Sequence, residues 1–221
     1  MRTVVFDLDG TLADTGADLI AAANTCFRGL GHGDLLHPEQ DKATAFRGGR
    51  AMLKLGFERL GGHAAPSEIE AQFPIFLDAY AEDIDRYTQL YPGVCETLEV
   101  LLEAGYRTAI CTNKPEALAE ILMQRLGARG LFGALVGADT LPVRKPDPAP
   151  YREAVSRVGG VLAQSLLVGD TETDHNTARA AGVASVLVTF GPEGQGVAAL
   201  GPDALLEDYA VLPDVVARLI G

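Results

Sequence analysis

Two aspartates near the amino terminus, Asp7 and Asp9, are the residues of this sequence best placed to do chemistry. They come directly after Val4–Phe6, a short apolar run that is typical of a buried strand. If the backbone stays extended as far as Asp9, both carboxylates point to the same side, because side chains alternate along a strand. Gly10 then allows a sharp turn. Two carboxylates crowded at the end of a strand repel each other, and a divalent cation would offset that repulsion.

Three more polar clusters follow apolar, strand-like runs later in the chain. They are Thr112-Asn113-Lys114, Arg144-Lys145-Pro146-Asp147-Pro148, and Gly169-Asp170 with Asp174 a little further on. Each cluster has an ordinary explanation of its own, because Asp and Gly are common in surface turns, Thr and Asn cap helices, and lysine is usually exposed. Their joint occurrence with the two aspartates is what favours a shared site.

The pattern of apolar residues places these clusters in one architecture. From Tyr91 onward, helical and strand-like segments alternate, and the strand-like segments are continuously apolar. The predicted strands cover residues 4–6, 107–111, 134–138, 165–168, 185–189 and 204–206, and the glycine-rich stretch 191–201 is predicted to be a loop. Such alternation is typical of a parallel, doubly wound α/β sheet. Ligands bind these sheets where the carboxyl ends of the strands open into a crevice, so we expect all four clusters to face one crevice.

Residues 15–88 differ from the rest of the chain because they carry helical patterns and no strand pattern. One predicted helix starts behind Ser67, which we expect to be its N-cap, and Pro74 is expected to kink it or divide it in two. We therefore expect two domains, a core formed by residues 1–14 and 89–221 and an inserted helical cap formed by residues 15–88. Hinges are expected where the chain crosses between them, near residues 14–16 and 89–91.

The composition restricts the class of protein. Of the 221 residues, 48% are hydrophobic and 22% are charged, which is typical of a soluble globular protein. Eighteen basic and thirty acidic residues give a net charge of −12, which argues against a nucleic-acid partner. No membrane span and no signal peptide are expected, and Cys26, Cys95 and Cys111 are expected to be reduced thiols. We expect a cytoplasmic monomer or homodimer without a membrane partner.

Together the four clusters supply carboxylates, hydroxyl and amide groups and one cation, which are the groups that phosphoryl transfer uses. The transferred group spreads its charge over three oxygens, so a site for it works by positioning and electrostatic stabilisation. Mg²⁺ prefers one or two carboxylates plus phosphate and water, and Asp7 and Asp170 could provide the carboxylates. Lys145 would hold the phosphate as a point charge.

In this order, four motifs resemble those of the haloacid dehalogenase (HAD) superfamily. They are Asp7-x-Asp9-Gly10-Thr11, Thr112-Asn113, Lys145-Pro146 and Gly169-Asp170-x-x-x-Asp174. The resemblance covers nearly the whole chain, including a helical cap inserted after the first motif. It implies a Rossmann-like HAD core, Mg²⁺ as the cofactor and a small-molecule phosphate ester as the substrate.

The resemblance also implies a role for each motif residue. Asp7 would be the nucleophile that forms an aspartyl-phosphate, and Asp9 would be the general acid and base. Because the family's dehalogenases lack the second aspartate, its presence argues against dehalogenase activity. The other implied roles are phosphoryl binding by Thr112, Asn113 and Lys145, Mg²⁺ binding by Asp7, the main-chain carbonyl of Asp9 and Asp170, and support of the site by Thr11 and Asp174.

Substrate choice in this family lies largely in the cap. Residues 46–53 resemble the cap loop of phosphoglycolate phosphatases, and Arg47 or Arg50 could bind a substrate carboxylate bidentately. The alternative is that both arginines are solvated beside a helix start. We expect a phosphoglycolate phosphatase-like enzyme, with a sugar-phosphate phosphatase, a β-phosphoglucomutase-like transferase and, more remotely, a receiver-type module as alternatives. No role is assigned to His175.

Overall fold

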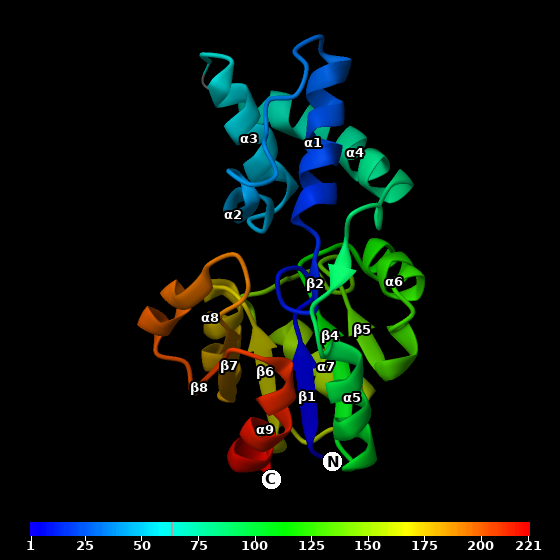
Figure 1. The fold of residues 1–221 in the computed structure, drawn as a ribbon, viewed down its shortest axis with the longest axis vertical. Coiled ribbons are helices and arrows are strands. Elements are labelled where there is room, and N and C mark those ends of the chain that lie inside the picture. The colour runs from blue at the N-terminus through cyan, green and yellow to red at the C-terminus, as the bar shows by residue number, and fades with distance from the viewer. Residues whose placement is uncertain (63) are drawn as a thin grey trace. The chain divides into compact units, whose positions relative to one another are not determined.

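Six short apolar segments pair into one parallel sheet (Figure 1). They are β1 (Thr3–Phe6), β4 (Arg107–Cys111), β5 (Ala134–Val136), β6 (Ser165–Gly169), β7 (Ala184–Val188) and β8 (Ala204–Leu206). Their order across the sheet is β5-β4-β1-β6-β7-β8, and each neighbouring pair is parallel. The expected doubly wound parallel sheet is confirmed, and the bounds of β4 agree with its prediction residue for residue.

Helices cover both faces of this sheet, which is why its strands are apolar throughout. They are α5 (Val94–Glu103), α6 (Glu116–Arg125), α7 (Ala149–Arg157), α8 (Glu172–Ala181) and α9 (Leu212–Ile220). Figure 1 shows α5 and α9 on one face and α7 and α8 on the other. Within β1, Val5 belongs to the core cluster that includes residues of α7 and α8. Because side chains alternate, Val4 and Phe6 point to the opposite face, and all three residues are fully buried.

The central position of β1 decides where the motif residues lie. Phe6 is paired with Ile110 of β4 and with Val168 of β6, so Asp7 emerges level with the ends of both neighbouring strands. The chain places β4 and β5 on one side of β1 and β6, β7 and β8 on the other. The strand order therefore reverses between β1 and β6. Such a reversal opens a crevice at the carboxyl ends of the strands.

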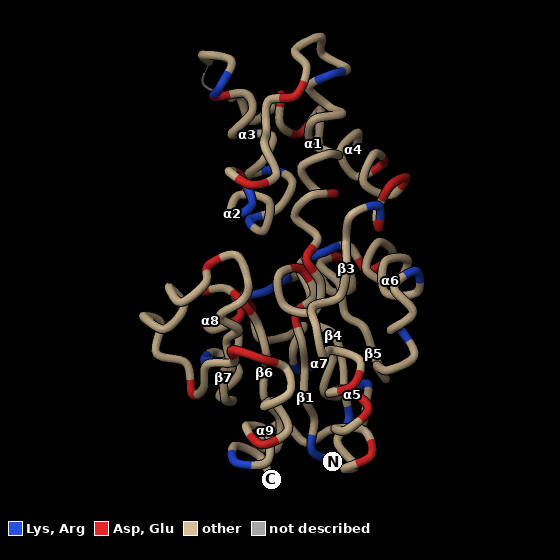
Figure 2. Tube along the Cα trace, viewed as in Figure 1, with Lys and Arg blue, Asp and Glu red and all other residues tan. Residues whose placement is uncertain are grey.

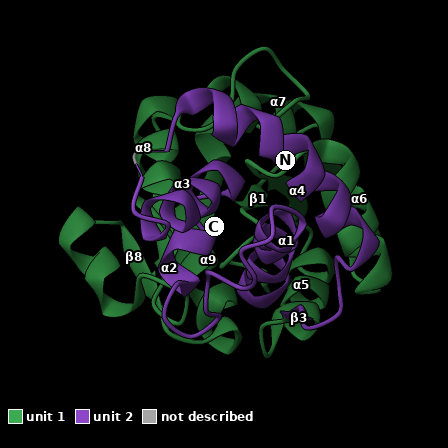
Figure 3. Cartoon of the chain, turned by 90° about the horizontal axis from the view of Figure 1, so that it is seen from above, with its two compact units in different colours: residues 1–14, 90–221 green, residues 15–89 purple. Residues whose placement is uncertain are grey.

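The structure, a computed structural model, describes residues 1–62 and 64–221, and the chain divides into two units. The sheet unit contains residues 1–14 and 90–221, and the helical unit contains residues 15–89 (Figure 3). The expected helical segment, residues 15–88, ends one residue earlier than this unit. A second, two-stranded sheet pairs β2 (Ala13–Asp14) with β3 (Gln89–Leu90).

The helical unit is built from amphipathic helices that bury aromatic residues against one another. Its described helices are α1 (Gly16–Gly29), α2 (Lys42–Ala45), α3 (Gly49–Arg59) and α4 (Pro66–Glu82). α1 packs against both α3 and α4. Phe27 of α1 and Phe57 of α3 meet edge to face, with ring centroids 5.5 Å apart. The helical character expected of this segment is confirmed for its described residues.

α4 differs from its prediction in two respects. It runs as one helix through Pro74, so the expected division into two helices is wrong. Pro74 cannot bond to the carbonyl of Glu70, but both residues are exposed and water can satisfy that carbonyl. The helix also begins at Pro66 instead of behind Ser67. Proline is favoured at the first helical position, and the Glu68 carboxylate accepts a hydrogen bond (3.0 Å) from the amide that precedes the helix.

Several short helical elements were not predicted, and α2 and one 3₁₀ helix show why. α2 is a single turn in which only Ala45 is buried, so it has no hydrophobic period to detect. Within the glycine-rich stretch predicted to be a loop, Gly194–Leu200 forms a 3₁₀ helix. Val197, which is 2% exposed, anchors this helix. Both elements owe their structure to packing and not to a local pattern.

Charge and cysteine chemistry are distributed over both units. Acidic residues occur along the helices and loops of each unit (Figure 2), as a net charge of −12 requires. Cys26, Cys95 and Cys111 are free thiols, and Cys26 and Cys111 are buried. Burial raises the pKa of the Cys26 thiol to about 11, so this thiol is unreactive at neutral pH. Among the described residues, no helix has both the length and the apolar character needed to cross a membrane.

Candidate active site

Asp7 is held at the end of β1 by the sheet itself. Its amide donates a hydrogen bond (2.9 Å) to the carbonyl of Val168 in β6, which extends the pairing by one residue. Nζ of Lys145 lies 2.9 Å from Asp7 Oδ1 and 2.6 Å from Asp174 Oδ1. The Lys145 side chain is only 1% exposed. A buried ammonium thus lies between two carboxylates.

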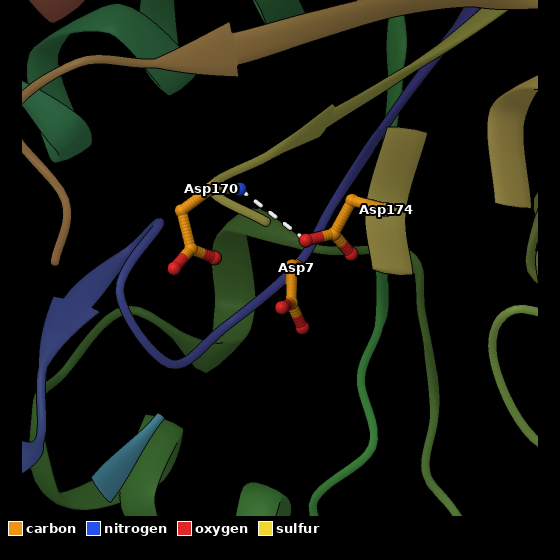
Figure 4. A group of neighbouring side chains, drawn as sticks. All are labelled: Asp7, Asp170 and Asp174. Atoms are coloured by element: carbon orange, nitrogen blue, oxygen red, sulfur yellow. Dashed lines mark hydrogen bonds between the residues drawn. The ribbon is translucent and has the colours of Figure 1, made fainter. Parts of the chain in front are cut away.

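Asp170 directly follows β6 and lies close to Asp7 (Figure 4). Its Oδ1 accepts a hydrogen bond (2.9 Å) from the Thr11 hydroxyl. Its Oδ2 is buried and has no hydrogen-bond partner among the described residues. Gly10 has a φ of +82°, and a Cβ at this position would lie 2.3 Å from Asp170 Oδ2. Only glycine therefore leaves room for this oxygen.

Asp174, in the first turn of α8, supports the other two carboxylates. One carboxylate oxygen from each of Asp7, Asp170 and Asp174 lies within 4.8 Å of the others. Both oxygens of Asp174 are occupied, however. Oδ1 binds Lys145, and Oδ2 accepts hydrogen bonds from the amides of Asp170 (3.3 Å, dashed in Figure 4) and Thr171 (3.2 Å) and from the Thr171 hydroxyl (2.9 Å). Asp174 therefore orients the ammonium and the loop after β6.

Two buried carboxylates, Asp170 and Asp174, and the partly exposed Asp7 face a single ammonium, which leaves this cluster short of positive charge. Burial raises the pKa of Asp7 to about 6, although Lys145 acts in the opposite direction. Burial also raises the pKa of Asp170 well above its ordinary range, and the charges of Asp174 and Asp7 raise it further. For Lys145, burial acts to lower the pKa, but Asp174 and Asp7 outweigh burial, so the pKa is raised and the ammonium keeps its proton.

These residues fit a hard divalent cation such as Mg²⁺. Asp170 offers a buried oxygen without a hydrogen-bond partner in the described part of the chain, and Asp7 offers a carboxylate within 4.8 Å of it. Carboxylate oxygens are the ligands that Mg²⁺ prefers. An added cation would also supply the positive charge that the cluster lacks.

Asp9 is paired with a lysine to which sequence analysis assigned no role. Nζ of Lys114 lies 2.9 Å from Asp9 Oδ1, and the Lys114 side chain is 4% exposed. The amide of Lys114 donates a hydrogen bond (3.1 Å) to Oγ1 of Thr112. Its place beside Thr112 and Asn113, directly after a predicted strand, was a usable indication.

Two of the three predicted phosphoryl ligands, Thr112 and Asn113, lie at the end of β4. Thr112 is buried, and its amide donates (3.0 Å) to the carbonyl of Val136 in β5. It directly follows Cys111, the residue of β4 that the register places level with Asp7. Asn113 is exposed, and its Nδ2 donates (3.0 Å) to the main-chain carbonyl of Lys145. Asn113 therefore ties the loop that carries Lys145 to the end of β4.

The two arginines proposed to bind substrate belong to the helical unit. The guanidinium of Arg50 donates to both carboxylate oxygens of Glu70 (2.6 and 2.8 Å) and lies 3.6 Å from the centre of the Phe73 ring. These contacts hold Arg50 against α4. Arg47 is exposed and lies in the loop just before α3. Substrate binding by either arginine stays a prediction.

Two other side chains, those of His175 and Tyr209, make contacts that the sequence did not indicate. Nδ1 of His175 in α8 lies 3.2 Å from the hydroxyl of Ser185 in β7, so His175 joins a helix to the sheet. The hydroxyl of Tyr209 donates (2.8 Å) to the main-chain carbonyl of Thr11, which is 198 positions away in the chain. No local pattern could reveal a contact over that separation.

Comparison with known proteins agrees with this geometry. A sequence profile described as haloacid dehalogenase-like hydrolase matches residues 4–188. Proteins named phosphoglycolate phosphatase from Agrobacterium fabrum and Rhodospirillum rubrum are 34% and 37% identical to this chain over 217 and 219 residues. These alignments cover 98% and 96% of this chain and 93% and 90% of the two relatives. The chain belongs to the haloacid dehalogenase-like hydrolases.

The likeness extends to the fold of other haloacid dehalogenase-like hydrolases. The crystal structure of a predicted phosphoglycolate phosphatase from Haemophilus somnus has a TM-score of 0.86 and 27% sequence identity, with 97% of each chain covered. The expected family and the expected enzyme class, a phosphatase-type hydrolase, are thereby confirmed. Membership of this hydrolase family argues against the receiver-type module that the sequence left as a remote alternative.

Proposed function

We propose that this haloacid dehalogenase-like hydrolase is a Mg²⁺-dependent phosphomonoesterase that acts through an aspartyl-phosphate on Asp7. One observation carries the proposal: at the end of β1, the Asp7 carboxylate lies 2.9 Å from the ammonium of Lys145 and within 4.8 Å of Asp170. Asp7, Asp170 and the main-chain carbonyl of Asp9 would hold Mg²⁺. When bound, the ion supplies positive charge that polarises the phosphoryl group.

Asp7 would act as the nucleophile. One of its carboxylate oxygens attacks phosphorus, the ester P–O bond breaks, and the phosphoryl group is left on Asp7. This step needs an ionised Asp7, and the neighbouring Lys145 favours that form against the effect of burial. Lys145 would also neutralise charge on the phosphoryl oxygens as the bond to phosphorus forms.

Asp9 would move the protons of both steps. In the first step its carboxyl group gives a proton to the leaving oxygen of the substrate. In the second, the carboxylate takes a proton from the water that attacks phosphorus, and the bond between phosphorus and Asp7 breaks. Lys114, 2.9 Å from Asp9 Oδ1, would hold the Asp9 side chain in place between the two steps. Both aspartates return to their starting forms.

For the substrate we propose a small phosphate ester that carries a carboxylate, such as 2-phosphoglycolate. The proposal is supported by the curated relatives, which are named phosphoglycolate phosphatases. It is also supported by two arginines in the segment 46–53 of the helical unit. We propose Arg47 as the ligand of the carboxylate and Arg50 as the alternative; to bind it, the guanidinium of Arg50 would have to leave its contacts with Glu70 and Phe73.

A phosphate-release assay on a substrate panel tests the proposed function. The panel contains 2-phosphoglycolate, sugar phosphates, nucleotides and pyrophosphate, each with Mg²⁺ and with a chelator in its place. The proposal predicts Mg²⁺-dependent release that is fastest with 2-phosphoglycolate. Release that is equally fast with the chelator would refute the metal dependence. Isomerisation of a sugar phosphate without net release would favour a β-phosphoglucomutase-like transferase instead.

A further inference from the structure

Tyr209 lies outside the segment 4–188 that matches the family profile, yet its side chain reaches the loop of the first motif. It opens a short 3₁₀ helix, Tyr209–Val211, that follows β8. The side chain is 1% exposed, and its hydroxyl donates a hydrogen bond (2.8 Å) to the main-chain carbonyl of Thr11. A tyrosine hydroxyl buried to this extent needs a partner, and here the partner belongs to the catalytic loop.

The position of the Tyr209 hydroxyl is fixed by its surroundings. The hydroxyl of Thr97 in α5 donates (2.9 Å) to the carbonyl of Tyr209, and the Asp208 carboxylate accepts (2.8 Å) from the amide of Ala210 to cap the 3₁₀ helix. The Tyr209 ring packs against the ring of Phe190, with centroids 5.5 Å apart. The hydroxyl is therefore a rigid anchor for the loop that it contacts.

Thr11 passes this constraint on to Asp170. Its carbonyl accepts from Tyr209, and its own hydroxyl donates (2.9 Å) to Asp170 Oδ1. Thr11 is fully buried, so water does not compete for either bond. With Oδ1 held in this way, Oδ2 is the oxygen of Asp170 that is buried without a hydrogen-bond partner among the described residues.

We infer that Tyr209 is a positioning residue for the proposed cation site, because its hydroxyl holds Thr11 and thereby orients Asp170 toward the cation. This inference rests on the proposed function, in which Asp170 is a Mg²⁺ ligand. Without the hydroxyl, the Thr11 carbonyl is a buried acceptor without a donor, and the Thr11 side chain is free to shift. Groups that orient a metal ligand contribute to metal affinity in this indirect way.

The test compares two tyrosine-to-phenylalanine variants of the full chain. Tyr209→Phe removes one oxygen and keeps the ring. Tyr151→Phe is a matched control, because Tyr151 is also fully buried and its hydroxyl donates (2.6 Å) to Ser165 at the amino-terminal end of β6. Mg²⁺ is titrated into each protein by calorimetry, and melting curves establish that each variant is folded.

Tyr209→Phe should weaken Mg²⁺ binding roughly three- to tenfold, whereas Tyr151→Phe should change Mg²⁺ binding by less than about twofold. Both substitutions should lower the melting temperature, because each removes a buried hydrogen bond. If Tyr209 acts through Thr11, adding Tyr209→Phe to a Thr11→Val protein should change the Mg²⁺ dissociation constant by less than about twofold. Unchanged Mg²⁺ affinity in a folded Tyr209→Phe protein, or an equal loss of Mg²⁺ affinity in both variants, would overturn the inference about Tyr209 and leave the proposed function intact. A wild-type protein that does not bind Mg²⁺ would overturn the proposed function and this inference together.

Discussion

At the scale of single residues, the electrostatics of the site depend on Lys145. Its ammonium is buried and faces Asp7 and Asp174, with Asp170 close by. A buried charge is tolerated only when partners offset the loss of water. Burial raises the pKa values of Asp7 and Asp170, and the neighbouring carboxylates, which one ammonium does not balance, raise them further. The cluster therefore lacks positive charge, which a further cation would supply.

Mg²⁺ binding should weaken as the pH falls through the pKa of Asp7. This pKa is raised from 3.8 to about 6, so between these values the native protein holds a proton that the unfolded chain has lost. The stability of the metal-free protein therefore decreases as the pH rises through this interval. Mg²⁺ must displace the same proton, so its dissociation constant should rise about tenfold from pH 7 to pH 5, and more if Asp170 also releases a proton.

Calorimetric titration with Mg²⁺ at a series of pH values measures this dependence. Glu153→Gln is a suitable control, because Glu153 pairs with Arg157 (2.8 Å) on the surface of α7. It should leave the pH dependence unchanged. A dissociation constant that stays constant between pH 7 and pH 5 would show that no carboxyl group with a raised pKa binds the ion.

At the scale of elements, close packing of α1 and α3 depends on a glycine. A Cβ at Gly56 would lie 2.1 Å from Cζ of Phe27. Phe27 cannot easily move, because it is fully buried and packs edge to face against Phe57. Gly56→Ala should therefore lower the free energy of unfolding by about 1–3 kcal/mol, despite the higher helix propensity of alanine.

Gly29→Ala is the matched control for this prediction. Gly29 ends α1, and a Cβ there would meet nothing within 4 Å. The same substitution should then be neutral or stabilise the protein by about 0.5–1 kcal/mol, because it restricts the unfolded chain. Urea unfolding of both variants checks the pair. Equal effects at the two positions would mean that the contact with Phe27 is not what limits residue 56.

The elements themselves were largely predictable from local pattern. β4 was predicted to the residue because its apolar run is bounded by Arg107 and the polar Thr112. Parallel strands that are buried on both faces read as continuous apolar runs, so the class of sheet was also predictable. The short α2 and the 3₁₀ helix over 194–200 were not, because an element of one or two turns has no period to detect.

At the scale of the whole molecule, the sequence indicated which residues meet but not every contact that holds them. Four motifs at strand ends predicted a shared crevice, and the structure brings Asp7, Lys145 and Asp170 together. The contacts of Lys114 with Asp9 and of Tyr209 with Thr11 were not predicted. Such contacts depend on the register of strands and on where loops return to the sheet, which side-chain pattern does not encode.

The proposed carboxylate ligand, Arg47, belongs to the helical unit, and its role in substrate choice can be tested by substitution. Arg47→Ala should raise the KM for 2-phosphoglycolate at least about tenfold, since a hydrogen bond to a charged group contributes about 1.5–3 kcal/mol. Hydrolysis of p-nitrophenyl phosphate, which has no carboxylate, should change little. Steady-state kinetics with both substrates make the comparison.

Arg50→Ala is the comparison for Arg47→Ala, because the contacts with Glu70 and Phe73 hold the Arg50 side chain against α4. Its removal should leave the KM for 2-phosphoglycolate within about twofold of the wild-type value. The assignment to Arg47 is wrong if the effects of the two substitutions on that KM are reversed, or if neither substitution changes it.

The most direct test of the central claim is phosphate release by the Asp7→Asn variant. The substitution keeps the size of the side chain but removes the nucleophile that the proposed mechanism requires. In the presence of Mg²⁺ and the best substrate of the panel, kcat should fall at least about a thousandfold while the melting curve still shows a folded protein. A folded Asp7→Asn protein that releases phosphate at the wild-type rate would contradict the account.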